Sequence, residues 1–577
     1  MSRSGSQTYS WLTADFIYFE LVSFFENKRA TWTEPTLLPC FPRRNSTLHH
    51  LTKSSWSPFL PIAATGAGAI LLYLVRYISY KLSVRGKLPI APRSEASWWL
   101  GHDYLVAKNE VGVEYGRWTR MLGPVFRIKS ALWQDDVVII SDHAAVKHIF
   151  GQAYTYIKSP ALQPIVVKVV GRGVVWAEGD EHKFQRKMIS PAFSISAVKK
   201  MAPHVMTCVE RLIQRMQNDC TSGGVFNLCD YIPAVTLEII GTVAFSYDFG
   251  PESPEGKAIL DAWHTDVTLF SSFAGFLAPI VIGVAPWITK LPIKALTEDG
   301  TAKKVIHQVG RKMLQEPPNL DRTDMFSILV RESWQGKLRP DAGRRLDDAT
   351  LLDNILTFFM AGFETTSSTI QFILHDLSQH SEVQRKLRQE ILAADSSDID
   401  VIESLPYLDA ITREGLRLHP SVRDTHRTAI HDDVIPLKNP VTLSNGETVT
   451  SLPVKAGEGF IIPFHVLNTD PTVWGPDADQ FIPERWLKDG SNPPADELPH
   501  GPWGNVSNFV DGPRYCIGWR LAVQEIKLIT AAIVKNFELK DTGATVKKFI
   551  SPGCATLHRR QGRLPPARDC SDSPLDR

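Results

Sequence analysis

Cysteine is scarce in this sequence, with 7 residues among 577, and no two of them form a Cys-x-x-Cys pair. The sequence also lacks a His-Glu-x-x-His segment, so the spacings typical of zinc sites are missing. An odd number of widely spaced thiols is typical of a reducing compartment rather than of a disulfide framework. Charge imbalance is lacking too, because 63 basic residues nearly balance 62 acidic ones, and the chain predicts no nucleic-acid partner.

Long linkers and repeats of fixed period are also missing, and 43% of the residues are hydrophobic. That composition supplies enough apolar side chains for a large packed core. We therefore expect one catalytic domain at residues 96–565, preceded by N-terminal attachments and followed by a tail at residues 566–577.

One uncharged run stands before this domain. The 18 residues from Pro58 to Val75, PFLPIAATGAGAILLYLV, reach the lower length limit for a helix that crosses a bilayer. We predict a transmembrane anchor at residues 58–80, after an extension at residues 1–57 that we expect to be poorly ordered. Two prolines in KLPIAP predict a stiff hinge at residues 81–95. The alternative to an anchor is a buried Ala/Gly-rich helix of the globular domain. Basic residues directly after the run favour the anchor and predict that the catalytic domain faces the cytosol.

The pattern beyond residue 96 is mainly helical. Apolar positions recur three and four apart, and a few stretches such as TVTSLPV and GFIIPF alternate like short strands. The longest helix is predicted at about residues 346–378, and another helix at about residues 518–536. This mixture predicts a fold that is mainly α with a small β component.

A loop just before the second of these helices carries the strongest chemical signal. The segment FVDGPRYCIG contains Phe509, Gly512, Arg514, Cys516 and Gly518. Backbone N–H groups at a helix start favour an anion, so the single cysteine is placed to be a thiolate. A thiolate ligand on haem iron promotes cleavage of the O–O bond, and glycines let a backbone pass close to a flat macrocycle. The segment is therefore a candidate haem-binding loop.

This F-x-x-G-x-R-x-C-x-G loop resembles that of the cytochrome P450 family, and the other motifs of the chain follow in the family's order. The resemblance implies the cytochrome P450 fold and a haem b whose iron is held by Cys516 as the axial ligand. It implies that Arg186, Arg427 and Arg514 bind the haem propionates, since forked cationic donors suit carboxylates. The family usually has a tryptophan where HKFQR has His182. A histidine there can still donate a hydrogen bond to a propionate, and the alternative is that His182 is only an exposed residue of a helix.

Two further motifs complete the resemblance. In AGFETT, Glu364 and Thr365 resemble the acid–alcohol pair that passes protons to dioxygen, although a helical threonine commonly bonds its own turn. In REGLRLHP, Glu414 and Arg417 share a helix face, and PERW supplies Arg485. The family joins these three in one buried network, so the resemblance implies a structural role; in isolation the pair on the helix reads as a solvated surface pair.

The segments that face the substrate, matched by position in the family, are mostly apolar, so we expect a lipophilic small molecule such as a terpenoid-like or other secondary metabolite, or a xenobiotic. These segments are residues 157–169, the central helix around Phe358, Phe359 and Phe363, residues 421–425 with Val422, and a late turn at residues 555–557. Aromatic residues in such places are alternatively core residues. The apolar segment 273–288, broken by glycine and proline, resembles the family's membrane-dipping lid.

The resemblance to fungal members implies a monooxygenase that inserts one oxygen atom from O2 into its substrate. Electrons would come from NADPH through NADPH-cytochrome P450 reductase, with cytochrome b5 as a further electron donor. The same resemblance, with the anchor, predicts a single-pass protein of the endoplasmic reticulum membrane. Lys183, Lys187, Arg514 and Arg520 are expected on the face that meets an acidic reductase, and a solvated basic face is the alternative.

Two other classes of function stay open. One is a haem-thiolate isomerase or dehydratase that rearranges an oxygenated substrate without O2 or external electrons, and the presence of Glu364 and Thr365 argues against it. The other is a haem-binding sensor without catalysis, which would need neither a substrate pocket nor a proton relay. The sequence does not identify the substrate or the carbon that is oxidised.

Overall fold

The structure is a computed structural model that describes residues 71, 74–75, 77–220, 227–291, 299–315, 325–327, 346–394, 396–487, 501–543, 546–550 and 555–559, the last two as backbone. Two compact units divide the chain, Met1–Tyr80 and Lys81–Arg577, and every element from α3 onward belongs to the second. The predicted extension at 1–57, most of the predicted anchor at 58–80 and the tail at 566–577 lie outside the described residues.

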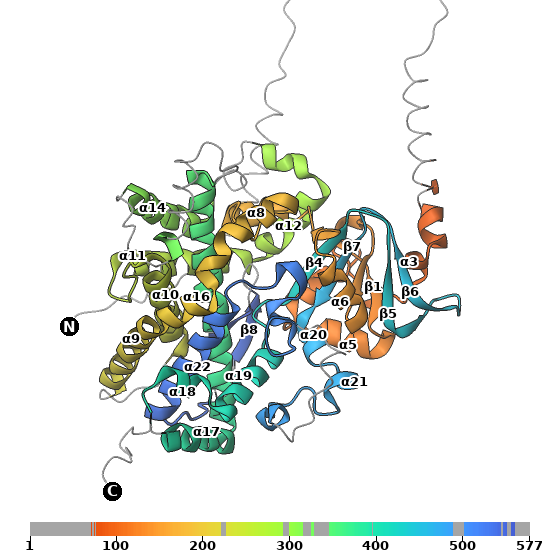
Figure 1. Ribbon diagram of the computed structural model, residues 1–577. Helices are drawn as coiled ribbons and strands as arrows, with labels where there is room; N and C mark the ends of the chain where they lie inside the picture. Colours follow the sequence, from red (N-terminus) through yellow and green to blue (C-terminus); the bar gives the residue numbers. More distant parts are fainter. Residues whose placement is uncertain are drawn as a thin grey trace, which may run out of the picture. The chain divides into compact units, whose positions relative to one another are not determined.

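Helices dominate the second unit, and Figure 1 shows most of them gathered on the side away from the sheet. The longer helices, of eight residues or more, are α5 (Val113–Leu122), α6 (His143–Gly151), α7 (Gln163–Val170), α8 (Gly179–Ile189), α9 (Ile195–Cys220), α10 (Leu228–Phe245), α11 (Pro254–Phe270), α12 (Phe273–Val284), α14 (Thr301–Gln315), α16 (Asp348–Gln379), α17 (Ser381–Ala394), α19 (Pro406–Leu418) and α22 (Trp519–Asn536). The shorter ones are α3 (Val84–Lys87), α4 (Asp103–Lys108), α18 (Ile399–Glu403), α20 (Phe464–Asn468) and α21 (Pro471–Trp474).

The two helices predicted at about residues 346–378 and 518–536 are confirmed. α16 spans Asp348–Gln379, and the side chain of its N-cap residue Asp347 accepts a hydrogen bond from the backbone N–H of Thr350. This cap satisfies one of the N–H groups that a helix start leaves without a partner. α22 begins one residue after Gly518, so the cysteine loop leads directly into it. Both helices pack together through the main hydrophobic core, which brings the two sequence motifs that they carry into one region.

A five-stranded sheet lies beside the helices in the order β1-β2-β7-β4-β3. Its strands are β1 (Val125–Ile128), β2 (Val137–Ile140), β3 (Tyr156–Lys158), β4 (Asp424–Ala429) and β7 (Gly459–Pro463). Two hairpins, β5 (Asp433–Thr442) with β6 (Thr448–Val454) and β8 (Val546–Ile550) with β9 (Ala555–Arg559), complete the β structure. The predicted strands TVTSLPV and GFIIPF correspond to β6 and to β7, so the expected mainly α fold with a small β component is confirmed.

The segment predicted as a stiff hinge, residues 81–95, is bound to the sheet in its central part. The backbone N–H of Ala91 donates to the carbonyl of Arg127 at 3.0 Å, and Arg127 donates back to the carbonyl of Pro89 at 2.8 Å. Leu88 and Ala91 are fully buried. This segment therefore continues the edge of the sheet next to β1, because the prolines stiffen an extended backbone that the sheet can bind.

A buried ion network ties α19 to the loops that follow the sheet. The carboxylate of Glu414 accepts hydrogen bonds from Nε and Nη2 of Arg417, both at 2.8 Å. It also accepts hydrogen bonds from Nε of Arg485 at 3.0 Å and from the indole N–H of Trp486 at 2.8 Å. Arg417 also donates to the carbonyls of Asn468 and Gln480, at 2.9 and 3.0 Å. The predicted network of Glu414, Arg417 and Arg485 is therefore present, and it is fully buried rather than a solvated surface pair.

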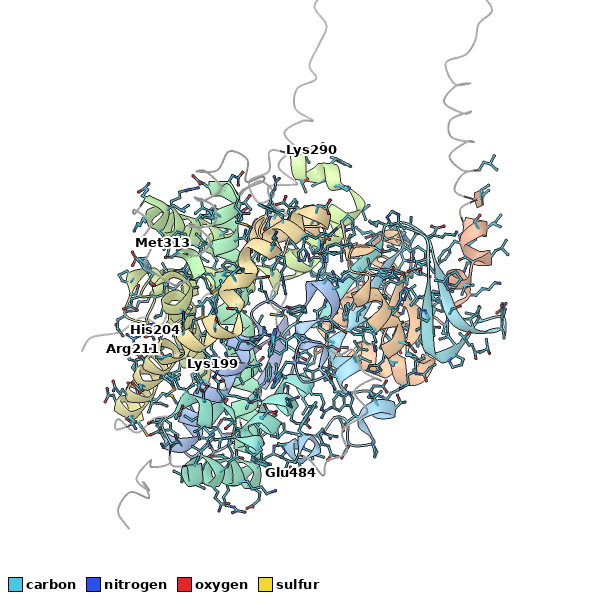
Figure 2. All side chains as sticks on the ribbon, viewed as in Figure 1. Lys199, His204, Arg211, Lys290, Met313 and Glu484 are labelled. Carbon is cyan, nitrogen blue, oxygen red and sulfur yellow. The ribbon has the colours of Figure 1, made fainter. Side chains whose placement is uncertain are left out.

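Of the described helices, α10 alone has the length and hydropathy to cross a membrane by itself, and α11 and α12 reach that criterion together across a bend of 70°. α10 packs between α9 and α16 with most of its residues buried, which is typical of a core helix. The segment predicted as a lid forms α12 and a short 3₁₀ helix, η4 (Pro286–Lys290), and Figure 2 shows Lys290 at the end of this segment.

Candidate active site

The loop before α22 holds Cys516 in a closed backbone turn. The backbone N–H of Cys516 donates to the carbonyl of Phe509 at 2.7 Å, which folds the intervening residues over on themselves. Phe509 is 7% exposed and packs edge-on against Trp503. The loop therefore presents the cysteine from a fixed backbone rather than from a mobile tip.

The two glycines of this loop have different roles. Gly512 has a φ of +69°, and a Cβ there would lie 2.1 Å from the carbonyl oxygen of Phe150 at the end of α6. Close packing against α6 therefore requires glycine at this position, and the further predicted reason, approach to a macrocycle, stays a prediction for Gly512. At Gly518 a Cβ would only reach ordinary contact with the ring of Phe193 at 3.5 Å, so the predicted reason stays a prediction there.

Cys516 is accessible to solvent although protein surrounds it. Burial raises the pKa of its thiol, while the backbone N–H groups of Gly518 and Trp519 and the charge of Arg186 lower it less. A side chain that is both accessible and deep inside the protein lines an internal cavity. The helix start does supply the expected N–H donors, but burial outweighs them, so the geometry of the loop alone does not make the thiolate.

The centre of α16 presents one narrow accessible strip. Ala361 is exposed and Thr365 is partly exposed, one helical turn apart, although most of their neighbours on the helix are buried. The Oγ1 of Thr365 donates to the carbonyl of Ala361 at 2.7 Å, and the hydroxyl of Ser421 donates to the carbonyl of Thr365 at 2.8 Å. Since a hydroxyl has one proton and two lone pairs, Thr365 can still accept a hydrogen bond while it donates to Ala361.

Glu364, the other half of the predicted pair, lies in the wall and not on this strip. It is 4% exposed, and its Oε2 accepts the indole N–H of Trp263 on α11 at 2.7 Å. Burial raises the pKa of Glu364 to about 7, and the indole hydrogen bond lowers it less. The carboxyl therefore exchanges a proton near neutral pH, as a group that moves protons must.

Three arginines from distant segments lie close to the cysteine loop. Arg186 on α8 donates to the carbonyl of Tyr515 at 2.8 Å, and Arg514 donates to the carbonyl of Ala177 at 2.9 Å. Arg427 on β4 is buried, and burial together with the charge of Arg514 lowers its pKa to about 10. Among the described residues, one buried guanidinium nitrogen of each arginine has no hydrogen-bond partner: Nη2 of Arg186, Nη1 of Arg427 and Nε of Arg514.

A lysine and a histidine complete this cluster. Lys158 pairs directly opposite Arg427 in the β3–β4 ladder, so both side chains share one face of the sheet. Burial and then the charge of Arg514 lower the pKa of Lys158 to about 7. His182 is 3% exposed, pairs through Nδ1 with the hydroxyl of Tyr154 at 3.1 Å, and has its pKa lowered to about 3 by burial and the same charge. It is therefore a neutral buried histidine and not an exposed one.

Comparison with known proteins agrees with this arrangement. A family model described as cytochrome P450 matches residues 92–564. The chain belongs to the cytochrome P450 family. It is 30% identical over 512 residues to cytochrome P450 monooxygenase claQ of Ampulloclitocybe clavipes, an alignment that covers 83% of this chain and 92% of that one. Cytochrome P450 monooxygenase 205 of Postia placenta is 29% identical over 495 residues, covering 82% and 90%.

The residues of the cavity fit the haem that the cytochrome P450 family uses. Unpartnered nitrogens on Arg186, Arg427 and Arg514 are suited to anionic oxygens, such as those of two propionates. Cys516 supplies the sulfur on the same side of the molecule, and metal coordination deprotonates a thiol whose pKa burial has raised. When bound, a haem with a thiolate ligand provides the activation of dioxygen.

Two of the residues predicted to line a substrate pocket are core residues instead. Phe359 is fully buried and stacks on Phe245 at 4.5 Å between ring centroids, and Phe363 is fully buried against Trp263 at 6.0 Å. A side chain that lines a cavity keeps accessible surface, so the prediction is wrong for Phe359 and Phe363. Phe358, which is 5% exposed, remains a predicted pocket residue.

Val422, partly buried beside the sheet, likewise remains a prediction for the pocket.

The predicted face for docking of a reductase needs one correction, because the side chain of Arg514 is 4% exposed and points inward, where it pairs with Glu178. Lys183 and Lys187 are exposed on α8 and stay candidates for that face. The helical period places these two lysines outward, but it gives no information about the direction of an arginine in a loop.

Trp263 was not predicted as a site residue, and Lys158 and Ser421 were predicted only as members of the substrate-facing segments 157–169 and 421–425. Lys158 joins the cation cluster through strand pairing, Trp263 reaches Glu364 from a helix about a hundred residues earlier, and Ser421 holds the carbonyl of Thr365. Each contact joins segments far apart in the chain. No local pattern in the sequence encodes such contacts, although the motif stretches that two of them meet were recognised.

Proposed function

We propose that this chain inserts one oxygen atom from O2 into a lipophilic small molecule, with electrons from NADPH through a reductase and with haem b as its cofactor. The observation that carries the proposal is the set of groups around the cysteine loop: the thiol of Cys516 is accessible, and buried nitrogens of Arg186, Arg427 and Arg514 have no partner among the described residues. The partly exposed Thr365 lies on α16, which packs against the helix that follows this loop. A role in fungal secondary metabolism is supported by the likeness of this chain to claQ and to other fungal cytochrome P450 monooxygenases.

The protein's own residues would perform three tasks in this reaction. Arg186, Arg427 and Arg514 hold the cofactor by its carboxylates. The buried aromatic residues along α16 exclude bulk water from the cavity wall. Thr365 accepts a hydrogen bond on the cavity side while its own proton is held by the carbonyl of Ala361, and Glu364, with a pKa of about 7, supplies protons from within the wall.

Replacing Thr365 with valine tests the proton-supply part of this proposal. The isosteric change removes the hydroxyl and keeps the shape, so fold, haem content and substrate binding should persist. We expect the ratio of NADPH consumed to product formed to rise about tenfold or more, with release of hydrogen peroxide, since general acid–base groups contribute about 10²–10⁴-fold. NADPH oxidation, peroxide and product are measured in parallel with a reconstituted reductase.

Thr369→Val is the matched control, because Thr369 is four residues further on the same helix and bonds the carbonyl of Thr365 and the hydroxyl of Ser421. It is buried and should leave the ratio nearly unchanged. Equal coupling in wild type and Thr365→Val would mean that Thr365 only satisfies its own helix, and turnover without NADPH would favour the isomerase or dehydratase class.

We also propose that the protein is held at the endoplasmic reticulum membrane with its catalytic domain in the cytosol. Support comes from large exposed aromatic side chains near α12: Trp98 is 74%, Trp133 is 60% and Trp287 is 62% exposed. Trp98 and Trp133 are in edge contact, and Trp99 meets Phe273 of α12. Tryptophan is enriched at membrane interfaces because one end of the ring is apolar and the other polar.

The topology has a direct test in two glycosylation acceptor sequences. Asn45-Ser46-Thr47, outside the described residues, should face the lumen and be glycosylated, whereas Asn505-Val506-Ser507 should stay bare on the cytosolic side. Endoglycosidase treatment of the chain made with microsomes should lower its mass, and Asn45→Gln should abolish that change. A glycan traced to Asn505 would reverse the orientation.

A further inference from the structure

The carboxyl of Glu364 has an unusual set of surroundings. It sits at the centre of α16, 4% exposed, and its Oε2 accepts the indole N–H of Trp263 at 2.7 Å. Its second oxygen, Oε1, is buried and has no hydrogen-bond partner among the described residues. Nearly every buried polar atom in a folded protein has a partner, so this unpartnered oxygen needs an explanation.

No charged group close to Glu364 competes with the indole. The influences on its proton affinity are burial and the Trp263 hydrogen bond, and neither α10 nor α11 contributes a charged side chain that shifts it. The charge of Glu364 acts on Cys229 of α10, whose pKa burial raises to about 11, so that thiol stays neutral. Within the described part of the chain, a single neutral donor therefore decides where the carboxyl points.

Trp263 is held firmly enough to act as such a donor. It is 8% exposed and packs edge-on against Phe363, the residue before Glu364 on α16. One turn later on α11, Asp266 accepts the backbone N–H groups of Thr301 and Ala302 at 3.0 Å and so caps α14. α11 is thus fastened at both sides of the indole, to α16 by packing and to α14 by hydrogen bonds.

We propose that Trp263 is a positioning residue that holds the carboxyl of Glu364 in the wall between α11 and α16 and sets how tightly it binds its proton. The inference rests on the proposed function, in which Glu364 supplies protons on the Thr365 side. The indole fixes Oε2 in the wall and leaves Oε1 as the oxygen that binds the exchangeable proton. Trp263 touches neither substrate nor cofactor in this role and acts through Glu364.

The sign of the effect follows from the hydrogen bond. An N–H donor stabilises the carboxylate more than the carboxylic acid, so removal of the donor favours the protonated form. Trp263→Phe should therefore move the titration of Glu364 upward by about one to two pH units, the ten- to hundredfold change expected for one hydrogen bond to a charged group. Wild type should titrate near pH 7, in line with the pKa of about 7 for Glu364.

The measurement is infrared difference titration of the full-length haem protein in its resting state, without turnover. The carbonyl stretch of a protonated buried carboxyl, assigned to Glu364 by its loss in Glu364→Gln, gives the midpoint directly. Trp118→Phe is the matched control, because Trp118 is also a buried indole that donates to a carboxylate, Glu95 at 3.1 Å. It should leave the midpoint at the wild-type value.

In turnover, the pH dependence of NADPH consumed per product should move upward with the infrared midpoint in Trp263→Phe. The double variant Trp263→Phe/Glu364→Gln should behave as Glu364→Gln alone. A wild-type midpoint in Trp263→Phe would overturn the proposal. A shifted infrared midpoint with unchanged coupling would keep the positioning role and remove Glu364 from the proton supply, so the two failures are distinguishable.

Should Trp263→Phe fail to fold, Glu364→Gln gives the same information from the other side, because glutamine keeps the acceptor oxygen and cannot titrate. The ultraviolet resonance Raman difference between wild type and Glu364→Gln should then contain an indole N–H band that changes between pH 5 and pH 9, about two units on either side of the Glu364 pKa of about 7. A pH-independent indole band would contradict the proposal.

Discussion

Replacing Cys516 with serine should abolish the thiolate-type spectrum of the reduced carbon monoxide complex and all product formation. Cys516 is the accessible cysteine in the cavity, whereas the other described cysteines lie in or beside the helical core, Cys208 fully buried on α9. A hydroxyl gives haem iron far less electron density than a thiolate, so any bound haem would lose the capacity for O–O cleavage. Purified variants are compared by reduced carbon monoxide difference spectra and by product analysis.

Cys208→Ala is the control, since this thiol is distant from the loop and contacts Thr242 and Arg211. It should keep the spectrum of the wild type, with some loss of stability because a buried side chain is shortened. A thiolate-type spectrum in Cys516→Ser would end the assignment of this residue as the iron ligand. That outcome would also remove the observation on which the proposed function rests.

Removing one member of the Glu414 network should prevent stable folding. In Arg417→Ala, the fully buried carboxylate of Glu414 loses its bidentate partner, and the carbonyls of Asn468 and Gln480 lose their donors. Breaking a buried ion pair by removing one partner costs about 3–5 kcal/mol, a large part of the stability of an ordinary domain. The free energy of unfolding from denaturant titration and the haem content per protein measure the loss.

Arg385→Ala provides a matched control on α17. Arg385 and Glu382 have the same three-residue spacing as Arg417 and Glu414, but their side chains are 54% and 73% exposed. Exposed pairs contribute about 0–1 kcal/mol, so this variant should fold and bind haem as the wild type does. If Arg417→Ala kept full stability and lost activity only, the network would be part of the chemistry and not of the fold.

The contrast between these two pairs shows where local sequence stops being informative. Both have an acid and an arginine three apart on an amphipathic helix, and the spacing alone predicts a solvated pair in each case. The family resemblance supplied the burial of Glu414 before the structure did. In physical terms, burial comes from Asn468, Gln480 and the 3₁₀ turn around Arg485, which close over α19 from fifty to seventy residues further along the chain.

The sequence by itself determined the long helices α16 and α22, strands β6 and β7 and the position of the cysteine loop before α22, because helical period, strand alternation and motif spacing act over a few neighbouring residues. Tertiary structure alone decided which face each residue meets. Packing against Phe245 buries Phe359, packing against α6 requires Gly512, and strand pairing brings Lys158 beside Arg427. Tertiary structure also decided the hydrogen bond from Trp263 to Glu364, because two helices about a hundred residues apart must pack together before the indole can orient the carboxyl.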